Sequence, residues 1–153
     1  MPVTTEALDT ATATRLRTVL GRLSRQLRTT TASAEAGLTP TKMSVLLSVD
    51  RRGMTRISEV AELEALNPTL LSRTISTLVD AGLLDRVSDA DDRRSAWVQV
   101  TDAGHRLAER MRRERTEVVN RGMSALPTAE RQIVEQAIPA LEALADQLRD
   151  GPR

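Results

Sequence analysis

The chain lacks cysteine, phenylalanine and tyrosine, and it has a single tryptophan, Trp97, and a single histidine, His105. Without cysteine it can form neither a disulfide nor a thiol redox centre. With only one histidine besides, a transition-metal site is not expected, and no D-x-D-x-D-G loop offers ligands to a hard cation. No Ser-His-Asp arrangement or phosphate-binding loop is visible. The sequence therefore predicts no catalytic residues, no metal, no cofactor and no enzyme.

Long apolar runs are also missing. No run approaches the length of a membrane span, and the N-terminus has no signal-peptide pattern, so we expect a cytoplasmic protein. The 153 residues, 40% of them apolar, suffice for one ordinary domain with a hydrophobic core. Because aromatic residues are almost absent, this core must be built from Leu, Val, Ile, Ala and Met, which favours helices.

An excess of charge of either sign is absent too, since the net charge is +1. Its distribution is uneven. Residues 1–37 hold five arginines against three acids, whereas residues 56–101 hold five arginines against eight acids, a net of 5 − 8 = −3. The central part of the chain is therefore not a basic patch.

That central part has the order helix, turn, helix and hairpin, which predicts a winged helix-turn-helix. Its segments are an amphipathic stretch (Ile57–Leu66), a turn at Asn67-Pro68, a helical stretch (Pro68–Ala81) ending at Gly82, and two strand-like runs (Leu83–Ser88 and Ala96–Thr101) around a charged tip (89–95). We expect Trp97, in the second run, to belong to the core.

The second helix has one apolar and one polar face. Asn67 is a good N-cap, and Pro68 suits the first helical position, where no donor is needed. The apolar stripe is formed by Leu71, Ile75, Leu78 and Val79, and the opposite face by Thr69, Ser72, Arg73 and Ser76. No acid occurs from Ala65 to Val79, so this polar face can approach phosphates and base edges without repulsion. The alternative is a surface helix that happens to be rich in serine and threonine.

These residues resemble the DNA-binding core of the MarR family of bacterial transcriptional regulators. The matching residues are Val60-Ala61, Ser72-Arg73, Leu78, Gly82-Leu83, Asp92-Arg93-Arg94 and Val100-Thr101-Asp102-Ala103-Gly104. The family's Asp-x-Arg wing signature falls on Asp92 and Arg94. Two positions depart from the family pattern: Glu64 stands where an apolar residue is frequent, and Ala65 where glycine is common.

The polar face and the resemblance together predict which residues contact DNA. Arg73 is the candidate base contact, because arginine pairs bidentately with guanine. At the hairpin tip Arg93 and Arg94 can enter a minor groove, with Asp92 holding Arg94. The full set is Pro68, Thr69, Ser72, Arg73 and Ser76 on the helix, Asp92, Arg93 and Arg94 at the tip, and Arg86, Lys42 and Arg56 as phosphate candidates. The open alternatives are a surface salt bridge for Arg73 and a solvated turn for the tip.

Amphipathic helices flank this module on both sides. The first is expected from Glu6 to about Ala34, fraying at Thr29–Ser33, and the last contains Pro139, which should kink it or start a second piece. Their apolar stripes are Leu16, Leu20, Leu23 and Leu27 in the first, and Val134, Ile138, Leu141, Leu144 and Leu148 in the last. The resemblance implies that both lie in a two-fold dimer interface; the alternative is a monomer in which they pack on their own module.

The predicted fold is mainly α with a small β-hairpin wing, a winged helix-turn-helix (38–101) between N-terminal (1–37) and C-terminal (102–153) dimerisation helices. The resemblance implies a homodimer that binds double-stranded operator DNA of pseudo-palindromic sequence, as a ligand-responsive repressor associated with the nucleoid when bound. It also implies a small phenolic or other lipophilic ligand in a crevice between the dimer helices and the DNA-binding lobe. The alternative function is a winged-helix protein-interaction module that does not bind DNA. His105 is expected to be solvated or a dimer contact.

Overall fold

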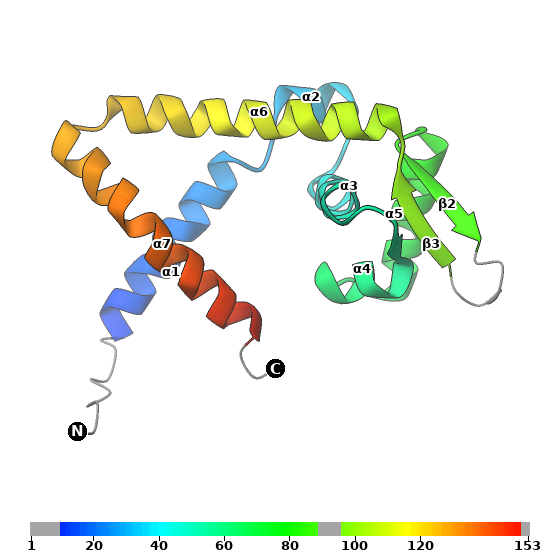
Figure 1. Ribbon diagram of the computed structural model, residues 1–153, viewed down its shortest axis with the longest axis horizontal. Coiled ribbons are helices and arrows are strands. Elements are labelled where there is room, and N and C mark those ends of the chain that lie inside the picture. Colours follow the sequence, from blue (N-terminus) through cyan, green and yellow to red (C-terminus); the bar gives the residue numbers. More distant parts are fainter. Residues whose placement is uncertain (1–9, 89–95, 151–153) are drawn as a thin grey trace. The chain divides into compact units, whose positions relative to one another are not determined.

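The protein is mainly helical with one small sheet (Figure 1). The computed structural model describes residues 10–88 and 96–150, so the wing tip with Asp92, Arg93 and Arg94 lies outside the described residues. In chain order the elements are α1 (Thr10–Gln26), α2 (Thr31–Glu35), α3 (Pro40–Arg52), β1 (Thr55–Arg56), α4 (Ile57–Leu63), α5 (Pro68–Asp80), β2 (Leu84–Ser88), β3 (Ala96–Val100), α6 (Asp102–Ala125) and α7 (Thr128–Asp150).

The chain divides into two compact units, residues 1–115 and residues 116–153. The first unit contains the sheet, helices α1 to α5 and the first part of α6. The second contains the rest of α6 and α7. The predicted helix-turn-helix and wing therefore lie within the first unit.

The sheet has the strand order β1-β3-β2, and both pairings are antiparallel. β2 and β3 are the two predicted strands of the hairpin. β1 pairs with β3 through Thr55↔Val98 and Arg56↔Trp97. Trp97 is not a core residue, because it is only half-buried and the guanidinium of Arg56 lies 5.0 Å from the centre of its ring.

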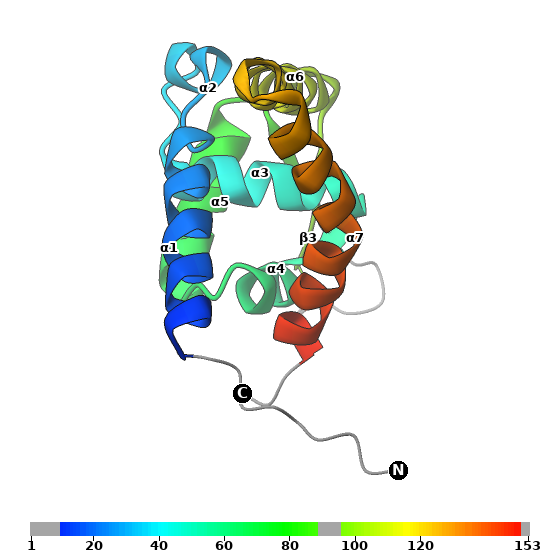
Figure 2. The same ribbon diagram turned by 90° about the vertical axis from the view of Figure 1, so that its left-hand side faces the viewer.

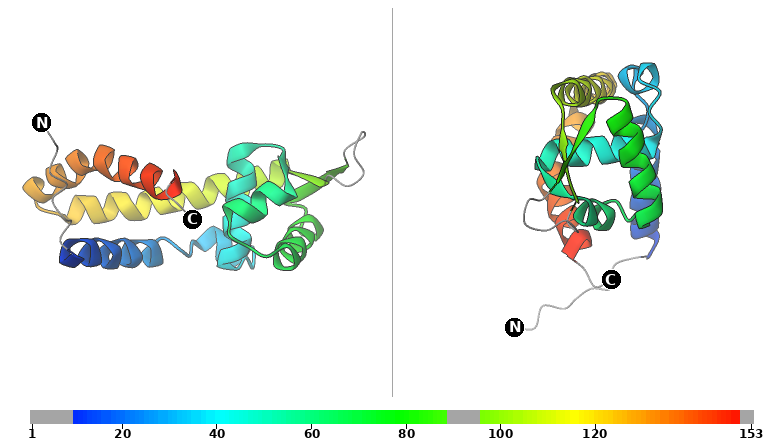
Figure 3. Two further views of the ribbon diagram at one scale, coloured as in Figure 1. Left: turned by 90° about the horizontal axis from the view of Figure 1, so that it is seen from below. Right: turned by 90° about the vertical axis from the view of Figure 1, so that its right-hand side faces the viewer.

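The helix-turn-helix is formed by α4 and α5, which lie against each other and beside the strands (Figure 3). α4 ends at Leu63, three residues earlier than the predicted stretch, and Ala65 then adopts a left-handed conformation with φ of 50°. Such a conformation costs a non-glycine residue about 1–2 kcal/mol, which explains why glycine is common here in the family. The side chain of Asn67 then caps α5 by accepting from the backbone N–H of Leu70 at 2.8 Å.

The core lies between α3, α4, α5 and the sheet. The apolar face of α5 fills its centre, as predicted from the stripe. The buried members are Val45, Leu46, Val49, Val60, Leu71, Ile75, Leu78, Leu83, Leu84 and Val98. A second, smaller cluster joins α2 and α3 to α6 and consists of Ala32, Met43, Leu47, Ala108 and Met111. As the composition indicated, aliphatic residues and methionine build both.

The N-terminal helix differs from the prediction. α1 ends at Gln26, and the threonine-rich stretch expected to fray starts a new helix, α2, instead. Thr30 caps α2, because its hydroxyl accepts from the backbone N–H of Ser33 while the Ser33 hydroxyl accepts from the backbone N–H of Thr30. Residues with weak helix propensity are good N-caps. The carboxylate of Glu114 on α6 accepts from the backbone N–H of Ala32 and so fixes α2 on α6.

The C-terminal helix also differs. α7 continues through Pro139 as a single helix, so the expectation of a second piece was wrong. A proline inside a helix removes one backbone hydrogen bond, and the remaining turns on either side hold the helix together.

The end of α5, the end of β3 and the start of α6 meet at four residues, Gly82, Leu83, Thr101 and Gly104, which we call the junction. The hydroxyl of Thr101 donates to the backbone oxygen of Gly82 at 2.7 Å and accepts from the backbone N–H of Gly104 at 3.0 Å. The backbone N–H of Thr101 donates to the oxygen of Leu83. Thr101 thus caps α6 and also ties the end of β3 to the end of α5.

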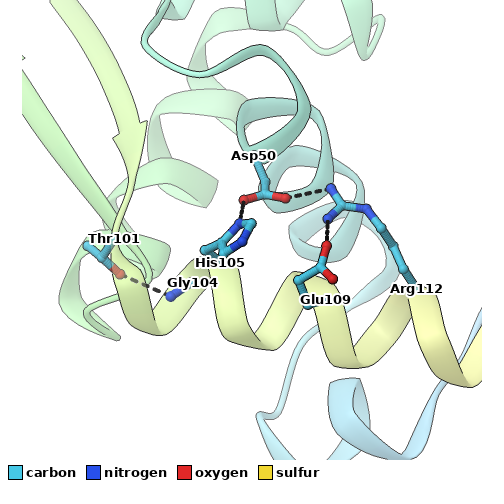
Figure 4. Close-up of polar contacts among 6 residues, drawn as sticks. All are labelled: Asp50, Thr101, Gly104, His105, Glu109 and Arg112. Carbon is cyan, nitrogen blue, oxygen red and sulfur yellow. Dashed lines mark hydrogen bonds and ion pairs between the residues drawn. The ribbon is translucent and has the colours of Figure 1, made fainter.

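A buried carboxylate holds α6 further along (Figure 4). Asp50, whose side chain is 2% exposed, lies at the end of α3; its oxygens accept from Nδ1 of His105 at 2.7 Å and from Nη2 of Arg112 at 2.5 Å. Arg112 also binds Glu109. The side chain of His105 is 57% exposed, as the solvated alternative expected, and it also binds Asp50.

The charge state of Asp50 follows from these contacts. Burial alone raises the pKa of the carboxyl, but the hydrogen bonds from His105 and Arg112 outweigh it and hold the pKa below the ordinary 3.8. Asp50 is thus ionised at neutral pH, and Nδ1 of His105 must carry the proton that it donates. Because the folded-state pKa is the lower one, these bonds stabilise the fold above pH 3.8, and this contribution is lost as the pH falls through the folded-state value.

Gly104 should tolerate no side chain, because a Cβ there would overlap the backbone oxygen of Leu83 and lie 2.8 Å from Cγ2 of Val100. We expect Gly104→Ala to lower the free energy of unfolding by about 2 kcal/mol or more. Gly122, also inside α6, is the control: a Cβ there would meet nothing within 4 Å, so Gly122→Ala should raise stability by about 0.5–1 kcal/mol. Denaturant titrations at one protein concentration compare the two variants, and equal effects would contradict the close contact at the junction.

Candidate nucleic-acid interface

The exposed face of α5 carries the predicted polar residues. Pro68, Thr69, Ser72 and Arg73 are exposed and Ser76 is half-buried, while Leu71, Thr74, Ile75 and Leu78 are buried. The prediction that these polar side chains share the face opposite the apolar stripe is confirmed. No acidic residue occurs in the first turn of α5. The helix can therefore present hydroxyls, one arginine and its positive dipole end to a polyanion.

Arg86 reaches this face from the wing strand β2. Its Nη2 donates to Oγ of Ser76 at 2.9 Å and lies 3.5 Å from the backbone oxygen of Ser72. The sequence indicated Arg86 and Ser76 as separate candidates. No sequence signal indicated that they contact each other, because ten residues and a helix end separate them.

Arg56 lies at another edge of the same surface. Its guanidinium stacks on Trp97, and it lines a hollow of about 560 Å³ together with Pro68 at the start of α5, Ser58 on α4 and Ala96 on β3. A cation–π contact orients the guanidinium but does not neutralise its charge. Arg56 is therefore held between the wing and the start of α5.

Lys42 lies apart from this group, half-buried in the first turn of α3. No hydrogen bond among the described residues joins its side chain to α5 or the wing. Asp92, Arg93 and Arg94 fall in the part of the chain that the structure does not describe, so their roles stay predictions.

Among the described residues, the acids of the helix-turn-helix and wing lie on α4, at the C-terminal end of α5 and on β2. Glu59 and Glu62 lie on α4, Asp80 is the last residue of α5, and Asp85 follows on β2. Glu64 directly follows α4 and accepts a short hydrogen bond from the hydroxyl of Ser44 on α3. Glu62 lines the same hollow as Arg56 and Pro68, so among the described residues the part of α5 before Asp80 is free of acids but its surroundings are not.

A groove of about 730 Å³ lies between the end of α1 and α3, two helices that run in different directions (Figure 2). Its walls mix apolar and basic side chains with one acid. They include Leu27, Arg28, Met43, Leu47, Arg51, Glu64, Leu66 and Arg115. Nε of Arg115 is buried and has no hydrogen-bond partner among the described residues, and burial lowers the pKa of its guanidinium. The sequence did not single out Arg115, because it stands in a run of interleaved arginines and glutamates typical of a solvated helix.

Two further features bear on the class of protein. Within residues 10–88 and 96–150, no three His, Asp or Glu side chains come together as metal ligands do. In the same residues, none of the helices combines the length and the hydropathy of a membrane span.

Comparisons with known proteins agree with this architecture. Residues 38–96 match the MarR family. Over 139 residues the chain is 31% identical to the HTH-type transcriptional regulator Mb0904 of Mycobacterium bovis, covering 91% of this chain and 96% of that protein. The crystal structure of a transcriptional regulator protein from Pseudomonas aeruginosa aligns with a TM-score of 0.73 and 30% identity, over 89% of this chain and 95% of that one. NadR, solved in complex with 4-hydroxyphenylacetate, aligns with a TM-score of 0.63 and 19% identity over 92% and 97%, a likeness of fold.

The capped recognition helix, its partner α4 and the three-stranded wing sheet define a winged helix-turn-helix protein. The chain belongs to the MarR family and is a DNA-binding transcriptional regulator. This assignment favours DNA binding over the alternative of a protein-interaction module.

Proposed function

We propose that the protein is a ligand-responsive repressor that binds a pseudo-palindromic operator as a homodimer in the cytoplasm, associated with the nucleoid when bound. The observation that carries this proposal is the exposed face of α5, which has no acid from Pro68 to Val79 and places Arg73 among the hydroxyls of Thr69 and Ser72. A dimer seated on an operator blocks access of other proteins to that DNA, which is the simplest route to repression.

In this proposal α5 enters the major groove. Arg73 reads guanine, while Thr69, Ser72 and the N-terminal backbone of α5 contact phosphates or base edges. Arg56, held on Trp97 beside Pro68, and Lys42 at the start of α3 are phosphate contacts. At the wing tip Arg93 and Arg94 enter the neighbouring minor groove, with Asp92 orienting Arg94.

The dimer is inferred from apolar side chains left exposed on α1 and α7, which belong to the segments flanking the DNA-binding domain (1–37 and 102–153). On α1, Leu20 and Leu23 are exposed and Leu16 is half-buried; Leu27, also half-buried, follows the helix. On α7 the exposed members are Val134, Ile138, Leu141 and Leu148, with Leu144 half-buried. Stripes of this kind on a monomer mark an interaction surface. A two-fold dimer covers the same stripe on both copies and sets two recognition helices at a fixed spacing.

The ligand is inferred from the groove between α1 and α3. Its apolar wall suits an aromatic ring. The buried Nε of Arg115, which has no hydrogen-bond partner in the part of the chain that the structure describes, suits a carboxylate. We therefore propose a small phenolic or other lipophilic acid; NadR, of similar fold, was solved with 4-hydroxyphenylacetate. Glu64 and Leu66 belong both to this groove and to the turn that leads directly into α5. A ligand there can bias the position of the recognition helix.

Arg73→Ala tests the DNA interface. It should weaken binding to a duplex selected from a random library by about 1–3 kcal/mol per half-site, because a bidentate base contact is lost. Loss on random-sequence duplex should be smaller, which separates base reading from phosphate contact. Fluorescence anisotropy measures both, with helix content followed by circular dichroism. Unchanged affinity for the selected duplex would exclude Arg73 as a reader.

Single glutamates in the apolar stripes test the dimer. Leu23 is 55% exposed on α1 and Ile138 is 47% exposed on α7. Light scattering at micromolar concentration should give a dimer for the wild-type chain and a lower mass for Leu23→Glu and Ile138→Glu, because each places two charges in a two-fold interface. Leu63→Glu is the matched control, since Leu63 is 43% exposed on α4, outside both stripes, and should leave the mass unchanged. A wild-type monomer would contradict the dimer.

Calorimetric titration with 4-hydroxyphenylacetate tests the ligand class. The acid should bind and weaken the DNA complex, whereas its neutral amide should not, because only the acid can pair with Arg115. Arg115→Gln should weaken binding of the acid by about tenfold or more, the usual effect of losing a hydrogen bond to a charged group. Arg113→Gln, an exposed arginine on α6 that does not line the groove, is the control. Equal binding of acid and amide would rule out a carboxylate at Arg115.

A further inference from the structure

Arg86 and Ser76, both candidates for contact with DNA, are bonded to each other. Nη2 of Arg86 donates to Oγ of Ser76 at 2.9 Å, and the same nitrogen lies at the outer limit of a hydrogen bond, 3.5 Å, from the backbone oxygen of Ser72. These contacts join the wing strand β2 to the middle of the recognition helix α5. The two residues therefore do not act independently.

The fold dictates that Arg86 reaches α5. Side chains alternate between the two faces of a strand, so Arg86 shares a face with Leu84. Leu84 is fully buried in the core beside Leu71, Ile75 and Leu78 of α5. Val98, which pairs with Arg86 across the ladder, is fully buried in the same core. This buried contact holds β2 against the helix, and Arg86, two residues beyond Leu84, extends over the exposed flank of α5.

The chemistry of the pair suggests which member meets DNA. Arginine has five N–H donors, and both contacts use Nη2, so Nε and Nη1 carry three others. Ser76 is neutral and Ser72 contributes a carbonyl, so these acceptors orient the guanidinium without cancelling its charge. A carboxylate in place of Ser76 would hold the arginine equally well but neutralise it toward a phosphate.

We propose that Ser76 is a positioning residue and that Arg86 is the DNA contact: the hydroxyl of Ser76 holds the guanidinium over α5, where it binds a backbone phosphate beside the major groove. The proposal rests on α5 and the wing being the DNA interface. An arginine held in place before binding loses less side-chain freedom on meeting the phosphate, so its orientation adds affinity. Ser76 then contributes through Arg86 and makes no DNA contact of its own.

The experiment is a mutant cycle on the full-length protein with the selected duplex, titrated at several salt concentrations. Ser76→Ala should weaken binding about twofold to tenfold per half-site, as for loss of one hydrogen bond in each subunit, and leave the salt slope unchanged. Arg86→Ala should weaken binding more and reduce the log–log salt slope by about 2 for the dimer, since each neutralised phosphate contributes about 0.9. Adding Ser76→Ala to Arg86→Ala should cost nothing further. Arg86→Lys, which keeps the charge, should keep the slope.

Thr69→Ala is the matched control, a hydroxyl on the same face of α5 whose effect should add to that of Arg86→Ala. If the effects of Ser76→Ala and Arg86→Ala add fully, Ser76 contacts DNA directly and the proposal is wrong. The proposal is also wrong if Arg86→Ala leaves the log–log salt slope unchanged, because Arg86 then neutralises no phosphate and only holds β2 against α5. In both cases Arg73→Ala and Thr69→Ala still weaken binding. If those two variants also bind normally, the interface itself is misplaced.

Discussion

The arrangement of the DNA-binding unit depends on the junction of Gly82, Leu83, Thr101 and Gly104. α5 ends there because Gly82, with φ of 69°, turns the chain so that the backbone N–H groups of Gly82 and Leu83 reach back to Val79 and Leu78. The hydroxyl of Thr101 then satisfies both the oxygen of Gly82 and one free amide in the first turn of α6, that of Gly104. Since Gly104 has no side chain, α6 can start in van der Waals contact with this point. The recognition helix α5, the strand β3 of the wing and the helix α6 are therefore all attached to one another at the junction.

The attachment of these elements at the junction limits how α6 can move. Asp50 adds a second attachment further along α6 through His105 and Arg112, and Glu114 attaches α2. The first part of α6 is therefore held by α2, by α3 and by the end of the wing. Any change that moves α6 within this unit must move these contacts together, so the ligand proposed for the groove beside Arg115 would act on a stiff element.

Much of this fold could be predicted from local sequence. The Asn67-Pro68 cap and the stripe of Leu71, Ile75 and Leu78 define α5 because capping and periodicity act within a few residues. The threonines after α1 misled the prediction, because a residue with low helix propensity can either end a helix or cap the start of the next one. Here Ser33, three residues after Thr30, completes the cap and so starts α2. Pro139 misled it because a long helix can lose one hydrogen bond and continue.

The site was less predictable than the fold. The residues on the exposed face of α5 follow from helical period, but the contact of Arg86 with Ser76 depends on how β2 packs on α5 through Leu84. The burial of Arg115 and of Asp50 likewise depends on where α1 and α3 lie. Side chains that acquire partners from distant segments leave no pattern in a single sequence, so Arg115, His105 and Asp50 could not be assigned roles from it.

The position of Trp97 gives the molecule an optical property. It is the chain's only tryptophan, and tyrosine and phenylalanine are absent, so the intrinsic ultraviolet fluorescence of the protein comes from one indole in the wing. That indole lies under the guanidinium of Arg56 and across the ladder from Val87. The emission therefore monitors the surroundings of the wing without a label, and contributions from α1, α7 or the groove do not mix with it.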